Sequence, residues 1–389
     1  MTPPFDSSAL SSAEKDALIA RLLARIDGLS KRLAAVEAEN AALREKLNLP
    51  PKTPDNSSTP PSQGRKASSE PTRKPKGKAH AGAYRPLHPN PTLRAFAIYL
   101  RFTQAISFER LSRLFSDLLG LDISEGALVN MLDDSRGAFA RQTGLIRARL
   151  LASTILESDE TSARVGKQTW WTWVFHHGED ACFVIHRNRS RAVVEGFLGE
   201  YRPDFWVSDR LASQMNWAKK DHQVCLAHLI RDAQYAIDAG DSAFAPGLRK
   251  LLQRACAIGE RREQLADATL RRYAYKLNAE LDGLMHIAPI HAAGKKFHNV
   301  IKGCRRYLFV FLADRAIPPT NNGSEQALRP CVTFRKVTNC FRSQWGANLY
   351  ADVRSVIETA RRRAIGALEA IRLTLNGTPL PVPAPYLSG

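Results

Sequence analysis

The sequence predicts an α/β protein whose central sheet-containing unit is preceded by helices and interrupted by a long helical insertion. Apolar residues follow helical spacing over 96–150, fall into short strand-like runs from about residue 151, and return to helical spacing after residue 223. At 389 residues, 44% hydrophobic and 24% charged, the chain has an ordinary globular composition. It is therefore long enough for two or more domains.

The charge balance points to a polyanionic partner. The chain has 56 Lys and Arg residues against 38 Asp and Glu residues, a net charge of +18. A generally basic surface kept for solubility is the alternative, but nucleic acid is the natural partner of such a chain. Its six cysteines include no Cys-x-x-Cys pair, which excludes a zinc ribbon and a dense disulfide framework. With neither a signal peptide nor an apolar run of spanning length, we expect a soluble cytoplasmic protein with no membrane partner.

Residues 1–48 are predicted to form a coiled-coil helix through which the protein self-associates. Apolar residues recur in alternating steps of three and four between residues 19 and 47, as a coiled-coil seam requires. Asn40 at one seam position favours a parallel two-stranded register. An amphipathic helix that folds back on the protein's own core is the alternative. The seam positions are Ile19, Leu22, Ile26, Leu29, Leu33, Val36, Asn40, Leu43 and Leu47.

Residues 49–95 are predicted to be a disordered linker rich in Pro, Ser, Lys and Arg. From 51 to 95, nine Lys or Arg stand against two Asp or Glu, a local net charge of +7. Such a segment buries too little apolar surface to fold alone. It is either a solvated linker or an arm that also contacts DNA phosphates.

Residues 96–150 are predicted to be helical. Within them, 108–131 reads as a helix, a short turn with glycine, and a second helix that opens at Ser124. This outline resembles a DNA-binding helix-turn-helix, although most helix pairs with such a turn only pack a core.

From residue 151 to 222 the order of predicted elements is β-β-β-α-β. TILESDET is the first strand, QTWWTWVFHH and DACFVIHR form a hairpin, RSRAVVEGFLGEY is a helix, and DFWVSD is the last strand. An acid ends the first strand and another ends the last, which is the outline of an RNase H-like core. A helical insertion is expected over 223–318, the final part of the core over 319–376, and a tail over 377–389.

Three acids are the candidate catalytic residues and metal ligands: Asp159, Asp209 and Glu325. The first two end strand-like runs, and Glu325 opens a helix after a Pro/Asn/Gly turn. Carboxylates gathered at one edge of a sheet repel one another unless a cation neutralises them. Hard oxygen ligands select Mg²⁺ or Mn²⁺ over zinc. Two such ions can clamp the attacking and leaving oxygens of a phosphodiester displacement.

Two further groups of residues have alternative interpretations. Cys225 and His228 form half of a zinc site or, as we prefer, a buried packing feature that fixes the helix after the second acid. Basic side chains surround Glu325 in the sequence and match phosphate oxygens in geometry, so we expect DNA contacts rather than a merely solvated helix face. They are Arg329, Arg335, Lys336 and Arg342.

From about residue 150 to 363 the chain resembles a DDE transposase of the insertion-sequence family called IS-sixty-six. The resemblance rests on Asp159-Glu160-Thr161 with Lys167, on Ser208-Asp209, on the segment from Cys225 to Asp232, and on Asn321-Asn322 through Glu325 to Pro330. The N-terminal coiled coil also resembles that family. The interval before the core, however, lacks the cysteine-rich module that family members commonly carry.

The resemblance implies an enzyme that cleaves transposon ends and joins the 3′-OH to target DNA by two-metal chemistry. It further implies Lys167 as a DNA contact, accessory proteins encoded by the same element, and a nucleoid-associated location in a bacterial cytoplasm. A non-catalytic DNA-binding regulator and a metal-dependent nuclease without strand transfer are the alternatives.

Overall fold

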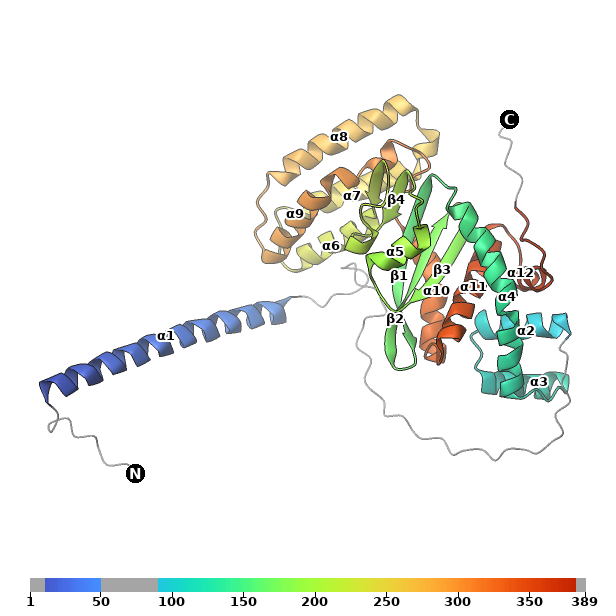
Figure 1. Ribbon diagram of the computed structural model, residues 1–389. Coiled ribbons are helices and arrows are strands. Elements are labelled where there is room, and N and C mark those ends of the chain that lie inside the picture. Colours follow the sequence, from blue (N-terminus) through green and yellow to red (C-terminus); the bar gives the residue numbers. More distant parts are fainter. Residues whose placement is uncertain (1–10, 50–89, 383–389) are drawn as a thin grey trace. The chain divides into compact units, whose positions relative to one another are not determined.

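A computed structural model describes residues 11–49 and 90–382 (Figure 1). The described residues fall into two units, one N-terminal helix and one larger α/β unit. Most of the predicted linker 49–95 and the end of the predicted tail 377–389 lie outside the described residues. Among the helices that are described, none is long and apolar enough to cross a lipid bilayer.

The N-terminal unit is one helix, α1 (Ser12–Asn48), of 37 residues. It covers the predicted heptads, so their helical character is confirmed. Four consecutive seam residues, Ile26, Leu29, Leu33 and Val36, are between 51% and 60% exposed. Within this unit, this row of apolar side chains is exposed along the helix.

The α/β unit begins with α2 (Pro91–Phe102), α3 (Phe108–Leu119) and α4 (Glu125–Leu150). Gly120 ends α3 with a φ of 62°, a left-handed conformation that glycine adopts without strain. The Ser124 hydroxyl accepts from the backbone N–H of Ala127 at 3.2 Å and caps α4. The predicted outline of helix, turn and helix over 108–131 is thus confirmed, whereas its role in DNA binding stays a prediction.

The sheet has five strands in the order β3-β2-β1-β4-β5. The strands are β1 (Ile155–Val165), β2 (Gln168–His177), β3 (Asp180–His186), β4 (Phe205–Ser208) and β5 (Asp221–Val224). The first three pair in antiparallel hairpins, while β4 runs parallel to β1 and β5 parallel to β4. The predicted β-β-β-α-β order is confirmed, with α5 (Arg191–Leu198) between β3 and β4. Strand β5 was not predicted, and it crosses the predicted boundary at residue 222.

Helices cover the sheet and one of its edges. The ring of Phe197 in α5 stacks on Phe175 of β2 with centroids 3.9 Å apart. Along the edge strand β3, hydroxyls of α11 (Gln344–Arg362) bond to backbone groups. Ser355 accepts from Phe183 N–H at 2.8 Å, and Thr359 accepts from Ala181 N–H at 3.1 Å. This edge is thereby closed to pairing with another strand.

The predicted insertion is helical and is built from α6 (Leu226–Asp238), α7 (Ala245–Glu260), α8 (Asp267–Met285) and α9 (Ala292–Cys304). Its buried residues form one core with Ile155, Val207 and Val224 of the sheet. The insertion therefore packs on the β4–β5 side of the sheet.

After the insertion, α10 (Asn322–Thr338) carries Glu325 in its first turn and packs beside β1. Helix α11 and then α12 (Ala367–Leu375) end the described part of the chain. All six cysteines are free thiols.

Candidate active site

Asp159 and Asp209 meet at the point where β4 ends. In the parallel pairing of β1 with β4, Glu157 lies opposite Val207. Continuing this register by two residues brings Asp159 opposite Asp209, directly after the last residue of β4. Residues in register on neighbouring strands project to the same side of a sheet. The parallel pairing itself therefore brings the two acids together.

The expectation that Asp159 ends its strand is wrong. Strand β1 continues to Val165, and Asp159 pairs with Val174 of β2. Because the antiparallel partner β2 extends beyond the end of β4, β1 keeps a hydrogen-bonding neighbour on one side only. Asp159 thus lies in mid-strand but beside an open position in the sheet.

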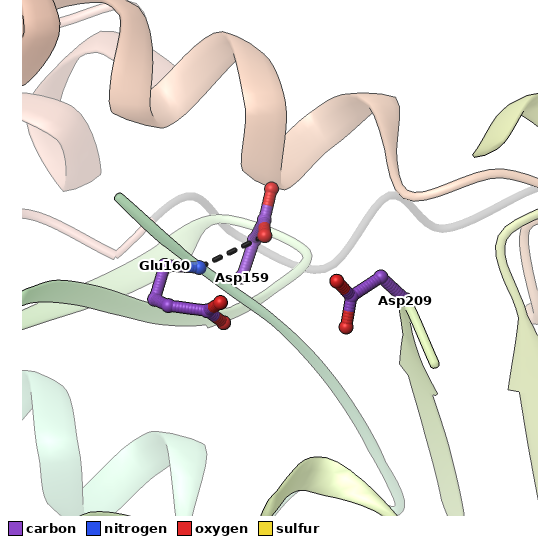
Figure 2. A group of neighbouring side chains, drawn as sticks. All are labelled: Asp159, Glu160 and Asp209. Carbon is purple, nitrogen blue, oxygen red and sulfur yellow. Dashed lines mark hydrogen bonds between the residues drawn. The ribbon is translucent and has the colours of Figure 1, made fainter. Parts of the chain in front are cut away.

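A third acid, Glu160, joins these two. One carboxylate oxygen from each of Asp159, Glu160 and Asp209 lies within 4.8 Å of the other two, and within the described ranges no other His, Cys, Asp or Glu residues form such a group. Figure 2 shows Asp159 and Glu160 leaving the strand in different directions, with Asp209 facing them. The Asp159 carboxylate accepts from the backbone N–H of Glu160 at 2.9 Å, and that of Asp209 accepts from Leu211 N–H at 2.8 Å.

Two acids of this group, Asp159 and Glu160, have raised pKa values. Burial raises the pKa of Asp159 well above its ordinary value, and the charges of Glu160 and Asp209 raise it further. Burial likewise raises the pKa of Glu160 to about 7, with a contribution from Asp209 that Arg189 opposes. Both shifts mean that the ionised carboxylates are unfavourable as they stand. A divalent cation between them would remove this penalty.

Glu160 was not among the predicted site residues. Its side chain is almost fully buried, forms an ion pair with Arg189 and accepts a hydrogen bond from the Gln214 amide. The Arg189 guanidinium lies over the Trp171 ring, 4.7 Å from its centroid. Neighbours on a strand point to opposite faces, so alternation alone separates Glu160 from Asp159. The acidic pair Asp159-Glu160 was the available sequence signal.

Glu325 lies beside the acidic group but in a different electrostatic setting. Its Oε1 accepts from the Arg231 guanidinium at 2.8 Å and lies 3.5 Å from His228 Nε2. Its charge contributes to the raised pKa of Asp159, so the two carboxylates are near each other. The structure thus brings Asp159 and Asp209 together and leaves Glu325 next to them, held by two residues of α6.

Cys225 and His228 belong to no group of three neighbouring ligands in the part of the chain that the structure describes. Instead, Cys225 Sγ accepts from the backbone N–H of Asn321 at 3.1 Å, and burial raises the pKa of the thiol to about 12. His228 faces Glu325, and burial together with Arg231 lowers its pKa. Both residues thus have contacts with the chain around the third acid, and the choice between packing and zinc binding stays a prediction.

The basic residues divide into exposed and anchored side chains. Arg335 is half-buried and donates to the Ser162 carbonyl oxygen at 2.8 Å, so it ties α10 to β1. Burial lowers its pKa. The other predicted DNA contacts are exposed: Lys167 in the turn between β1 and β2, Arg329, Lys336 and Arg342.

Comparison with known proteins agrees with this geometry. The family model described as "Transposase IS66 family" matches residues 87–349, more than half of the chain. The match includes all three predicted acids and every segment on which the resemblance in the sequence rests. No curated protein is similar enough to the chain to count as a match. Because the match covers more than half of the chain, the chain belongs to the IS66 family of transposases.

Proposed function

We propose that this chain is a DNA transposase that cleaves the ends of its element and joins them to target DNA with the help of divalent metal ions. The observation that carries the proposal is the meeting of Asp159 and Asp209 where β4 ends, in a chain of this family. The net charge of +18 supports a nucleic-acid substrate.

The sheet supports an RNase H-like core. Three antiparallel strands are followed by two parallel ones in the order β3-β2-β1-β4-β5, with the first acid on β1 and the second directly after β4. In this topology, the parallel neighbours β1 and β4 place Asp159 and Asp209 next to each other. The helical insertion then separates the second acid from the third in the sequence, while the charge of Glu325 still acts on the first acid, Asp159.

The residues present fit Mg²⁺ or Mn²⁺. They offer closely spaced carboxylate oxygens, which hard cations prefer. Burial, and then the neighbouring carboxylates, raise the pKa values of Asp159 and Glu160, so a bound cation would favour their ionised forms. When bound, two such ions would activate the attacking oxygen and neutralise charge on the leaving oxygen. Asp159 and Asp209 would hold them, and Glu325 would complete the second position once it leaves Arg231.

Two displacements at phosphorus account for the reaction. In the first, a water oxygen attacks at the element end, the bond from phosphorus to the 3′ oxygen breaks, and a free 3′-OH is left. In the second, that 3′ oxygen attacks a phosphorus of target DNA and displaces the target's own 3′ oxygen. The chain contributes mainly fixed positions for the reacting groups and a fixed arrangement of charge.

Exposed basic groups supply the DNA contacts in this proposal. Lys167 follows Asp159 in the sequence, and Arg329, Lys336 and Arg342 follow Glu325. All four are exposed and can reach phosphates, whereas Arg335 donates to Ser162. The helix pair over 108–131 and the basic segment 51–95 are further candidates. Contacts to phosphate add affinity without reading sequence.

Self-association through α1 is part of the same proposal. Its exposed seam, periodic over Ile26 to Val36, matches a second copy of the same helix. Removing residues 1–48 should shift the protein to a smaller oligomer in light scattering. An unchanged number of subunits would mean that these heptads do not hold the oligomer together. We also expect the protein to act with accessory proteins encoded by the same element and to associate with the bacterial nucleoid.

A cleavage and joining assay tests the function. The DNA on either side of the gene supplies the candidate ends, which are incubated with protein, target plasmid and Mg²⁺. We expect nicking at the element ends followed by joined products, and neither with EDTA or with Asp159→Asn. Binding without nicking would identify a regulator instead, and nicking without joining would identify a nuclease.

A further inference from the structure

We propose that Asn321, with Cys225 as its partner, is a positioning residue that fixes the spacing of the three acids. The inference rests on the proposed metal-dependent function and assigns a task to two residues outside the acidic group. It follows from hydrogen bonds that connect the chain next to each acid.

Asn321 links the third acid to the first. Its side chain is fully buried, and its Nδ2 donates to the backbone carbonyl of Ser158 at 2.8 Å. Ser158 directly precedes Asp159 in β1. The carbonyl of Asn321 in turn accepts from the backbone N–H of Glu325 at 3.2 Å in the first turn of α10. One residue therefore holds both Asp159 and Glu325 through the backbone.

Cys225 extends this link to the second acid. The backbone N–H of Asn321 donates to Cys225 Sγ at 3.1 Å, and the backbone N–H of Cys225 donates to the Ser208 carbonyl at 2.9 Å. Ser208 directly precedes Asp209. The residues before the first and second acids are thus joined through only two intermediates, Asn321 and Cys225.

The orientation of the Asn321 amide follows from its neighbours. A backbone carbonyl only accepts, so the amide nitrogen must face Ser158 and the amide oxygen must face Ser324. The Ser324 hydroxyl donates to that oxygen at 2.6 Å. His176 Nε2, 2.8 Å from the same hydroxyl, must then be the donor to Ser324. Because Asn321, Ser324 and His176 are all buried, water cannot replace these bonds.

Such a linkage matters because a metal site tolerates little displacement of its ligands. Mg²⁺ requires near-octahedral oxygens at about 2.0–2.1 Å. Residues that hold ligands in place typically change metal affinity by about tenfold to a hundredfold when they are removed. We expect an effect of this size from Asn321, although it contributes no ligand itself.

Gln223 offers a matched control. It is also a fully buried amide that bridges two segments: its Nε2 donates to the Leu308 carbonyl at 3.0 Å, and its Oε1 accepts from Phe311 N–H at 3.0 Å. These bonds tie β5 to the last part of the insertion and do not connect the acids. Asn321→Ala and Gln223→Ala therefore remove similar bonds with different expected consequences.

The test measures Mn²⁺ binding to the full chain from the free-ion signal in electron paramagnetic resonance, together with thermal melting in EDTA. Both variants should melt at a lower temperature than the wild type, by similar amounts. Only Asn321→Ala should raise the Mn²⁺ dissociation constant, by about tenfold to a hundredfold. Wild-type affinity in Asn321→Ala, or equal weakening in Gln223→Ala, would overturn the inference.

A second pair of variants keeps the test valid if Asn321→Ala does not fold. Cys225→Ser retains an acceptor for the Asn321 N–H, whereas Cys225→Ala removes it. We expect Cys225→Ala to bind Mn²⁺ several-fold more weakly and Cys225→Ser to restore most of the affinity. Equal, wild-type binding by both would contradict the linkage. Failure of the proposed function has a different signature, namely a wild-type protein that binds no Mn²⁺ or binds it as well after Asp159→Asn.

Discussion

The two halves of the candidate site differ in how their negative charge is balanced. On the sheet, Asp159, Glu160 and Asp209 gather closely, and the ion pair of Glu160 with Arg189 is too little to prevent raised pKa values. On the helical side, Glu325 receives a hydrogen bond from Arg231 and faces His228. The sheet half is therefore arranged for a cation, whereas the helical half is balanced by the protein's own side chains.

This difference suggests an order of assembly. The sheet half already brings three carboxylates close together, and none of them has to leave Arg231. The helical half can contribute only after Glu325 exchanges Arg231 for an ion. DNA phosphates are suitable new partners for the released guanidinium. The predictions that follow separate the two halves by experiment, from the largest expected effect to the smallest.

Replacing an acid in either half should abolish activity, but only replacement of an aspartate in the sheet half should abolish binding of the first metal ion. Asp159→Asn, Asp209→Asn and Glu325→Gln should each reduce end cleavage to background, because the reaction needs both metal positions. Calorimetric titration with Mn²⁺ should nevertheless show no tight binding in the two aspartate variants and one retained ion in Glu325→Gln. Retained tight binding in Asp159→Asn would place the first ion elsewhere.

The free energy of unfolding should depend on pH because of the raised pKa values in the sheet half. The pKa of Glu160 is raised from 4.5 to about 7 in the folded protein, so the folded state holds its proton where the unfolded chain has lost it. The contribution of Glu160 to stability in EDTA should therefore be fully present below pH 4.5 and be lost as the pH rises through about 7. Denaturant unfolding at several pH values measures this slope.

Two variants calibrate that profile. Glu160→Gln should reduce the fall between pH 4.5 and about 7, and the remaining fall belongs to the other buried acids with raised pKa values, Asp159 and Asp352. Mg²⁺ should reverse the part that comes from the acidic group by favouring the ionised carboxylates. The exposed Glu369 serves as a matched control, and Glu369→Gln should leave the slope unchanged. An unchanged slope in Glu160→Gln would show that Glu160 does not contribute to it.

The metal-free melting temperature should move in opposite directions for the two halves. Asp159→Asn relieves repulsion and should raise it, whereas Glu325→Gln weakens the contact with Arg231 and should lower it. A change of ~1 kcal/mol corresponds to about 2–4 °C in a unit of a few hundred residues. Differential scanning calorimetry in EDTA checks both signs. Shifts in the same direction would remove the distinction between the halves.

Releasing Glu325 should have the smallest effect. Arg231→Gln removes its charged partner, so Mn²⁺ should bind the second position several-fold more tightly in the absence of DNA. Competition with Mg²⁺ in a fluorescence titration would measure this. Unchanged affinity would mean that Arg231 does not compete with the ion.

Much of this fold follows from local sequence pattern, and the parts that do not have physical causes. The hairpin from Gln168 to His186 was predictable because its apolar and aromatic residues alternate around a glycine turn. Strand β5, DHQV, carries no such alternation. Its residues are buried by the parallel neighbour β4 and by the insertion, which are tertiary effects.

The site shows the same division. Asp159, Asp209 and Glu325 were predictable from their flanking motifs, and the first two do meet. The continuation of β1 beyond Asp159 was not predictable, because it depends on pairing with β2 rather than on an apolar run. The contact of Glu325 with Arg231 joins residues 94 positions apart, on two helices whose packing no local pattern encodes.

The most direct test of the central proposal is strand joining with a pre-cut element end. An end that terminates in a 3′-OH should be joined to a target plasmid in Mg²⁺ by the wild-type protein. The same end without its 3′ hydroxyl, or the Asp159→Asn protein with the intact end, should yield no joined product. Joining that needs no 3′-OH, or that survives Asp159→Asn, would contradict the proposed attack of the 3′ oxygen and the role of the acidic group in it.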